Sequence, residues 1–177
     1  MEGVRPAGPA DTARCVALLL AAAAEARQAR GGVFLTEGAV GTGGAGREAT
    51  AGDGPPAVRD LIRRWSGAAD ATLLVATFEG VAVGLAAGTI EAEGAGPSGP
   101  DGVGVGSLGR IRCCYVEPAA RSVGVGSAMV EALLEWFTAR GCRGVDALAL
   151  PGDRSTKQLL ETAGFKTRLL VLHRSFG

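Results

Sequence analysis

Two glycines and an arginine at fixed spacing form the segment of this sequence that is best suited to chemistry. The segment reads Arg121-Ser122-Val123-Gly124-Val125-Gly126-Ser127. Because glycine has no Cβ, Gly124 and Gly126 would let a ligand come close to the backbone. If a helix begins here, its first N–H groups lack internal partners and carry partial positive charge. With the added charge of Arg121, the segment predicts a site for a phosphate or diphosphate group.

The elements on either side of this segment would position it in the required way. A β-prone stretch precedes it, from Arg110 to Pro118, and proline cannot donate a ladder hydrogen bond. After the segment, apolar side chains recur at spacings of three and four residues as far as Arg140, which predicts a helix. Gly141 follows as a helix-ending residue. The phosphate-binding segment is therefore expected at a junction between a strand and a helix.

At these residues the chain resembles the GNAT superfamily of N-acetyltransferases. The acetyl-CoA motif of that family is Arg or Gln, two residues, Gly, one residue, and then Gly or Ala, which the segment from Arg121 to Gly126 matches. The motif follows a strand ending in Val-x-Pro, here Val116-Glu117-Pro118. A helix ending in Gly-Phe is expected downstream, and Gly164-Phe165 fits. The resemblance is strong from about Leu108 to Phe165 and looser from Thr72 to Ile90.

The resemblance implies that acetyl-CoA is bound as the co-substrate. It assigns cofactor binding to the end of the strand, to the glycine segment and to the start of a later helix. The residues concerned are Tyr115, Val116, Arg121, Ser122, Val123, Gly124, Val125, Gly126, Ser127 and Asp153. Asp153 stands where many members have an asparagine that touches the pantetheine arm, and an ionised aspartate accepts hydrogen bonds but does not donate them.

The implied reaction is direct transfer of an acetyl group from acetyl-CoA to a primary amine of a small molecule or a protein. The ammonium must lose a proton to a carboxylate, a histidine or a chain of waters, and a backbone N–H near Val116 would stabilise the oxyanion. Many members have a tyrosine as general acid where this chain has Leu160. Tyr115, the single tyrosine, is therefore the candidate catalytic residue, with water as the alternative donor. Leu160 and Asp153 also leave open a non-catalytic acyl-CoA-binding or regulatory module.

Periodicity and turn residues predict a single α/β (α+β) domain over residues 1–177. The expected elements are a strand, two helices, three strands, a helix, a strand, a helix and one or two final strands. Their ranges are 4–6, 11–30, 55–67, 72–78, 81–90, 110–117, a helix up to 140, 145–150, 153–163 and 166–176. The resemblance implies a mixed, mostly antiparallel sheet of about six to seven strands with helices on both faces. The Gly-rich segments 36–56 and 91–107 are expected to be mobile loops.

Several smaller expectations concern single residues. Asp11 or Thr12 is expected to cap the first helix, and Asp153 or Ser155 the last one. Gly84 and Gly88 either weaken their strand or mark the close approach of another backbone. Adjacent cysteines on a strand face opposite ways, so Cys113 and Cys114 are expected to be free thiols packed on opposite faces of the sheet.

Composition and spacing argue against several other functions. The chain has 18 basic and 18 acidic residues and a formal net charge of zero, which disfavours a nucleic-acid partner. No apolar run reaches the ~20 residues that span a bilayer, so we expect a cytoplasmic protein without a membrane partner. The four cysteines include no two-residue-spaced pair and the one histidine is His173, so no metal site is expected. The resemblance is compatible with a homodimer.

Two further segments match the dinucleotide pattern Gly-x-Gly-x-x-Gly, at residues 41–46 and 104–109. No strand is expected before the first, and a strand rather than a helix is expected after the second. Without a strand, a loop and a helix in that order, neither segment can place a diphosphate on a helix end. The pattern therefore does not predict a nicotinamide-dependent oxidoreductase.

Overall fold

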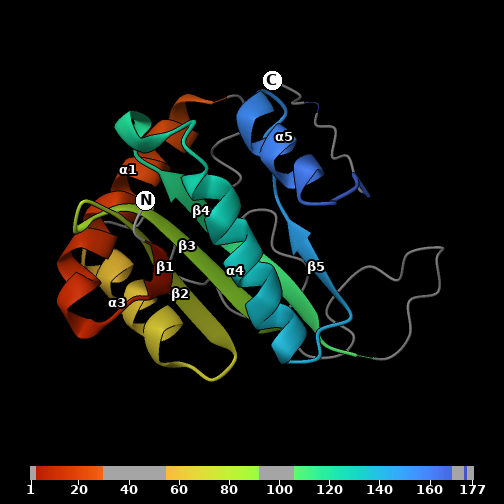
Figure 1. Ribbon diagram of the computed structural model, residues 1–177, viewed down its shortest axis with the longest axis horizontal. Helices are drawn as coiled ribbons and strands as arrows, with labels where there is room; N and C mark the ends of the chain where they lie inside the picture. Colours follow the sequence, from red (N-terminus) through yellow and green to blue (C-terminus); the bar gives the residue numbers. More distant parts are fainter. Residues whose placement is uncertain (1–2, 30–54, 92–105, 169–173, 175–177) are drawn as a thin grey trace.

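The computed structural model describes residues 3–29, 55–91, 106–168 and 174. Figure 1 shows one sheet with helices packed on it. The strands are β1 (Gly3–Pro6), β2 (Ala71–Phe78), β3 (Val81–Glu91), β4 (Leu108–Val116) and β5 (Gly144–Ala147). The helices are α1 (Thr12–Gln28), α3 (Pro55–Gly67), α4 (Val125–Ala139) and α5 (Arg154–Thr162), with short 3-10 helices η1 (Pro9–Asp11) and η2 (Pro118–Ala120).

The strands follow each other across the sheet in the order of the sequence, from β1 to β5. The first four are antiparallel to their neighbours. β5 is parallel to β4, which requires a crossover, and α4 supplies it. The mixed, mostly antiparallel sheet is thus confirmed.

The expected number of strands is wrong for the described residues, which form five rather than six or seven. The strand expected at 145–150 ends at Ala147, opposite Ile111, because β5 is not paired with β4 beyond that point. Within the range 166–176, residues 166–168 form no strand, and 169–173 and 175–176 lie outside the described residues. The loops expected at 36–56 and 91–107 also fall mostly outside them.

The sheet separates two apolar clusters, so helices cover both of its faces (Figure 1). Side chains from α1 and α3 pack with Leu73 and Val75 of β2 on one face. The neighbouring residues Leu74 and Ala76 point to the other face, where the side chains of α4 cover them. This alternation along one strand is the period-two pattern of a sheet that is buried on both sides.

Glycines in the sheet allow α4 to pack closely on its face. A Cβ built on Gly109 would lie 2.5 Å from Cδ1 of Phe137, and one on Gly88 would lie 2.7 Å from Cζ of the same ring. Gly84 would bring a Cβ to 2.9 Å from Cε of Met129. The close approach of another backbone, expected at Gly84 and Gly88, is therefore wrong, because the nearest groups at both glycines are side chains.

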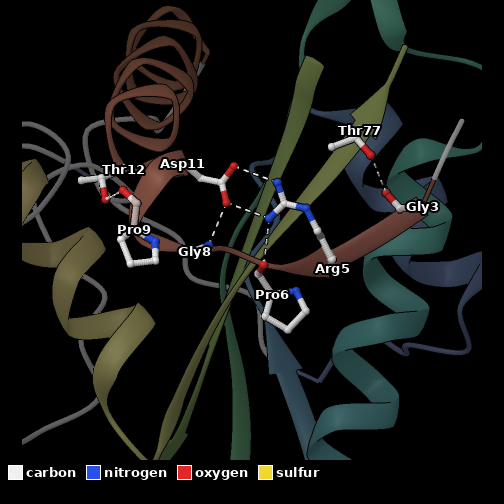
Figure 2. Close-up of polar contacts among 8 residues, drawn as sticks. All are labelled: Gly3, Arg5, Pro6, Gly8, Pro9, Asp11, Thr12 and Thr77. Atoms are coloured by element: carbon white, nitrogen blue, oxygen red, sulfur yellow. Dashed lines mark hydrogen bonds and ion pairs between the residues drawn. The ribbon is translucent and has the colours of Figure 1, made fainter. Parts of the chain in front are cut away.

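The chain between β1 and α1 is held by a fork-shaped ion pair (Figure 2). The guanidinium of Arg5 donates to both carboxylate oxygens of Asp11, at 2.7 and 2.9 Å, and the N–H of Gly8 donates to the same carboxylate at 2.7 Å. The hydrogen bonds from Arg5 are the main cause that lowers the pKa of Asp11. Asp11 stands at the N-cap position of α1, but its side chain makes no cap hydrogen bond there because these groups occupy it.

Candidate functional site

β4 loses one of its two neighbours halfway along its length. Its pairing with β5 ends where Ile111 faces Ala147, whereas β4 itself continues to Val116. Figure 1 shows β5 leading away from β4 toward α5. We call residues 112–116 the open edge of β4, because they lie beyond the pairing with β5 and residues 113–116 are paired with β3 alone.

A β-bulge marks the point where the two strands separate. Ile111 faces Gly88 and Cys113 faces Ala87, so Arg112 is an extra residue between two consecutive residues of β3. A bulge bends the strand that carries it and increases the local twist. No local pattern predicts this bulge, since nothing distinguishes Arg112 from its neighbours on the strand.

Two backbone N–H groups point outward along the open edge. The N–H of Glu117 donates to the carbonyl of Val83 at 2.9 Å, and it therefore points toward β3. Because the direction of these groups alternates along an antiparallel strand, the N–H groups of Val116 and Cys114 point away from β3. The carbonyl of Val116 also points away from β3, since it accepts a hydrogen bond from Nε of Arg121 at 2.9 Å.

α4 begins beside this strand end with N–H groups that no side chain caps. Its N-cap is Gly124, with φ of 85°, and no side chain makes a cap hydrogen bond. The first N–H bound within the helix is that of Ala128, which donates to the carbonyl of Gly124 at 3.0 Å. The N–H groups from Val125 to Ser127 are consequently the unpaired donors of a helix N-terminus.

The two glycines of the motif have different surroundings. A Cβ built on Gly124 would meet no atom within 4 Å, so the space in front of this residue is open. A Cβ on Gly126 would lie 3.3 Å from Cδ2 of Leu159, so this glycine gives α5 room to pack against α4. Of the surrounding residues, Ser122, Val123 and Ser127 are exposed.

Arg121 is directed toward α1 and β4. One terminal nitrogen of its guanidinium lies 2.6 Å from Oε2 of Glu25 on α1, and its Cζ lies 5.6 Å from the ring centre of Tyr115. Burial, with a smaller contribution from the charge of Glu25, raises the pKa of Tyr115, so its phenol is protonated at neutral pH. Tyr115 packs against the cluster beneath α1 and α3. Sequence reasoning missed Glu25, because no local pattern connects it to Arg121.

Asp153 is the N-cap residue of α5, and its carboxylate accepts three hydrogen bonds. The donors are the N–H of Thr156 at 2.9 Å, its hydroxyl at 2.6 Å, and the hydroxyl of Ser155 at 2.8 Å. Burial opposes ionisation of this carboxyl group, but these hydrogen bonds outweigh it and lower the pKa of Asp153. Of the two expected caps of this helix, Asp153 is the one that caps it.

The sequence profile of the Acetyltransferase (GNAT) family matches residues 46–165 of this chain. The chain belongs to the GNAT acetyltransferase family. The resemblance inferred from the glycine motif, Val-x-Pro and Gly-Phe is thereby confirmed. No protein among the curated sequences matches this GNAT chain.

Solved structures share the fold of this GNAT chain over nearly its whole length. A transcriptional regulator from Bacillus halodurans C-125 is 18% identical, with 98% of each chain covered and a TM-score of 0.68. The aminoglycoside antibiotic 6'-N-acetyltransferase AAC(6')-IG from Acinetobacter haemolyticus is 15% identical, with 99% of this chain and 98% of that one covered and a TM-score of 0.66. AAC(6')-Iy, in complex with the bisubstrate analogue CoA-S-monomethyl-acetylneamine, is 16% identical, with 98% and 97% covered and a TM-score of 0.67. At these identities the similarity shows the fold alone.

Three residues that were considered for the chemistry, Leu160, Cys113 and Cys114, offer no group that is ready to react. Leu160, where the resemblance places a general acid, is 8% exposed and packs into the cluster beneath α4. The thiols of Cys113 and Cys114 contact opposite clusters, as expected from their alternation. Burial raises the pKa of each thiol to about 12, so neither is a thiolate nucleophile at neutral pH.

The described residues were searched for a metal-binding group and for a membrane-spanning helix. Among them, no group of three or more His, Cys, Asp or Glu side chains is arranged to hold a metal ion. Within the same ranges, no helix has the length and apolar character needed to cross a bilayer. His173, the single histidine of the sequence, lies outside the described residues.

Proposed function

We propose that this protein transfers an acetyl group from acetyl-CoA to a primary amine of a small molecule or a protein. One observation carries the proposal. In a chain of the GNAT family, the open edge of β4 ends beside an α4 N-terminus that no side chain caps. The first feature offers hydrogen-bond donors to the thioester and the pantetheine arm, and the second offers donors and a dipole to the diphosphate.

The proposed cofactor site follows the chain from β4 into α4. The diphosphate of CoA accepts hydrogen bonds from the N–H groups of Val125, Gly126 and Ser127, and the open space at Gly124 admits it. Ser122 and Val123 border the same opening, and Tyr115 and Val116 end the strand beside it. Arg121 contributes through its contact with the carbonyl of Val116. Asp153 completes the site as an acceptor for an amide N–H of the pantetheine arm.

The reaction proceeds by direct attack of the neutral amine on the thioester carbon. A carbon–nitrogen bond forms and the carbon–sulfur bond breaks, while the amine proton passes to a carboxylate, a histidine or water. Backbone N–H groups of the open edge, at Val116 and Cys114, stabilise the oxyanion of the tetrahedral intermediate. The phenol of Tyr115, whose pKa is raised, stays protonated at neutral pH and supplies a proton to the CoA thiolate, with water as the alternative donor.

The same assignment extends to the whole chain, 1–177, as a single acetyltransferase domain. It is supported by β1, which lies before the residues that match the family profile and yet pairs with β2 of the same sheet. The co-substrate is acetyl-CoA, and the proposed reaction needs no metal.

A second candidate function is a non-catalytic acyl-CoA-binding or regulatory module on the same fold. Leu160 favours it, because this buried leucine has no proton to give where the resemblance expects a general acid. The two candidates share the cofactor site and differ only in turnover.

Release of free CoA thiol from acetyl-CoA across a panel of primary amines tests the proposal. Accelerated release with at least one amine, and an acetylated product of matching mass, is the expected result. Calorimetric titration with CoA is run alongside. Binding of CoA without acceleration by any amine would favour the module, whereas absence of binding would remove both candidates.

A further inference from the structure

We propose that Glu25 is a positioning residue for acetyl transfer, acting through Arg121 on the open edge of β4. The inference rests on the proposed function of this site. It starts from an ion pair that joins two distant parts of the chain, since Oε2 of Glu25 lies 2.6 Å from the guanidinium of Arg121, and 96 residues separate them. Neither the glycine motif nor the resemblance assigns a role to α1.

Arg121 uses different nitrogen atoms for its two partners. Nε donates to the carbonyl of Val116, at 2.9 Å, and a terminal nitrogen donates to Glu25. The guanidinium is a rigid planar fork, so fixing one arm restricts the direction of the other. Glu25 therefore determines how Arg121 presents its Nε–H to β4.

The carbonyl of Val116 lies on the same edge of β4 as the N–H groups proposed to bind the thioester. The peptide that contains it is held on its opposite side by the N–H of Glu117, which donates to the carbonyl of Val83 at 2.9 Å. On the open edge, the hydrogen bond from Arg121 to the carbonyl of Val116 takes the place of one that a neighbouring strand such as β5 would otherwise provide. An oxyanion donor must be aligned before the reaction, because its contribution depends on distance and direction.

α1 is itself fixed at a second point. Arg14 donates to the carbonyl of Ala82 at 2.7 Å and lies 2.6 Å from the carboxylate of Glu117. Arg14 and Glu25 are about three turns apart on the helix, so both face the same side. Two ion pairs thus connect α1 to the turn between β4 and the cofactor segment. In one of them α1 contributes the arginine, Arg14, and in the other it contributes the glutamate, Glu25, which binds Arg121.

Kinetics of four variants separate positioning from simple support of the fold. Glu25→Gln is expected to lower kcat about two- to fivefold, which matches the interaction free energy of a half-exposed ion pair. The Kd for CoA should stay unchanged. Arg121→Gln is expected to lower kcat about tenfold or more, because it also removes the hydrogen bond to Val116. The double variant should be no slower than Arg121→Gln, since Glu25 acts only through Arg121. Arg121→Lys keeps the charge but not the fork, and should resemble Arg121→Gln.

Two controls match these variants. Arg14→Gln loosens α1 without touching Arg121, and Glu131→Gln removes an exposed negative charge from α4; both should keep kcat within about twofold. The inference is overturned if Arg14→Gln slows the reaction as much as Glu25→Gln does. The inference is also overturned if Glu25→Gln lowers kcat by the same factor in the Arg121→Gln background as it does in the wild-type protein. A Glu25→Gln variant that binds CoA more weakly but keeps its kcat would overturn it as well. A wild-type protein that binds CoA but acetylates no amine overturns the proposed function together with this inference, whereas failure confined to the variants overturns the inference alone.

Discussion

The two halves of β4 are built differently although they belong to one strand. Residues 108–111 are paired with β3 and β5 at once, and all of them are buried. Residues 112–116, the open edge, lie beyond the pairing with β5, only residues 113–116 are paired with β3, and none of the five is fully buried. An unpaired N–H in the first half would lose a hydrogen bond without gaining one from water. In the second half the same group remains available to a ligand, so one strand serves both the core and the site.

The first half should be the more sensitive to changes in packing. Phe137→Ala removes the ring that lies over Gly88 and Gly109. A fully buried phenylalanine replaced by alanine lowers the free energy of unfolding by about 3–5 kcal/mol. Urea denaturation measures the loss. A change below about 1 kcal/mol would contradict the close packing of α4 on this half of the strand.

A second substitution sharpens this prediction. Gly109→Ala should by itself cost about 1–3 kcal/mol, because its Cβ would overlap the ring of Phe137. In the Phe137→Ala background the same Cβ has room, so the double variant should be more stable than the sum of the single losses predicts. Additive losses would mean that the ring and the glycine do not touch.

The open edge should respond to proline in activity more than in stability. Val116→Pro deletes an N–H that points away from β3, so the ladder to β3 stays complete. If this group binds the oxyanion, kcat should fall about 10²- to 10³-fold. Cys113→Pro is the matched control, because alternation directs its N–H toward β3 and its loss should mainly lower the unfolding midpoint. Equal loss of stability in both variants would refute the assignment of the open edge.

The start of α4 should be sensitive to any side chain at Gly124. Asparagine tolerates positive φ better than most residues, so Gly124→Asn should fold and place a side chain in the open space. The Kd for CoA is expected to rise about tenfold or more, which corresponds to ~1.4 kcal/mol of binding. Gly141→Asn makes the same change at the other end of α4, where φ is 70° and no atom lies within 4 Å of the Cβ. Calorimetry should show unchanged affinity for that control.

The cap of α5 gives the smallest expected effect, and it depends on pH. Asp153→Ala should cost about 1 kcal/mol of unfolding free energy at pH 7. Because the pKa of Asp153 is lowered in the folded protein, its carboxylate stabilises the fold above the unfolded pKa of about 4. That stabilisation is lost as pH falls through the folded pKa. Thermal unfolding from pH 7 downward should show the two proteins converging, and a difference that grew toward low pH would have the wrong sign.

Local signals in the sequence were sufficient for the elements that carry the cofactor motif. Apolar periodicity placed α4, which ends near the expected Gly141 with its φ of 70°. The alternation of Cys113 and Cys114 between two clusters followed from strand geometry alone. These features depend on neighbours within a few residues, so a single sequence is enough to read them.

Features that depend on distant partners were not predicted. The bulge at Arg112 exists only in relation to Ala87 and Gly88 of β3. The ion pair of Glu25 and Arg121 joins residues that no spacing rule connects. Arg121 was expected to add charge at the mouth of the site, and the identity of its carboxylate partner had to come from the fold. The strand count of six to seven came from the resemblance, and the described residues form five strands.

The two adjacent thiols of Cys113 and Cys114 can report the order in which the two layers of the protein unfold. Cys113 lies in the layer under α1 and α3, and Cys114 in the layer under α4. A brief pulse of alkylating reagent during unfolding, followed by mass analysis, would label first whichever thiol is uncovered first. Because one peptide contains both sulfur atoms, the order in which the two layers detach can be read from a single fragment without adding any probe.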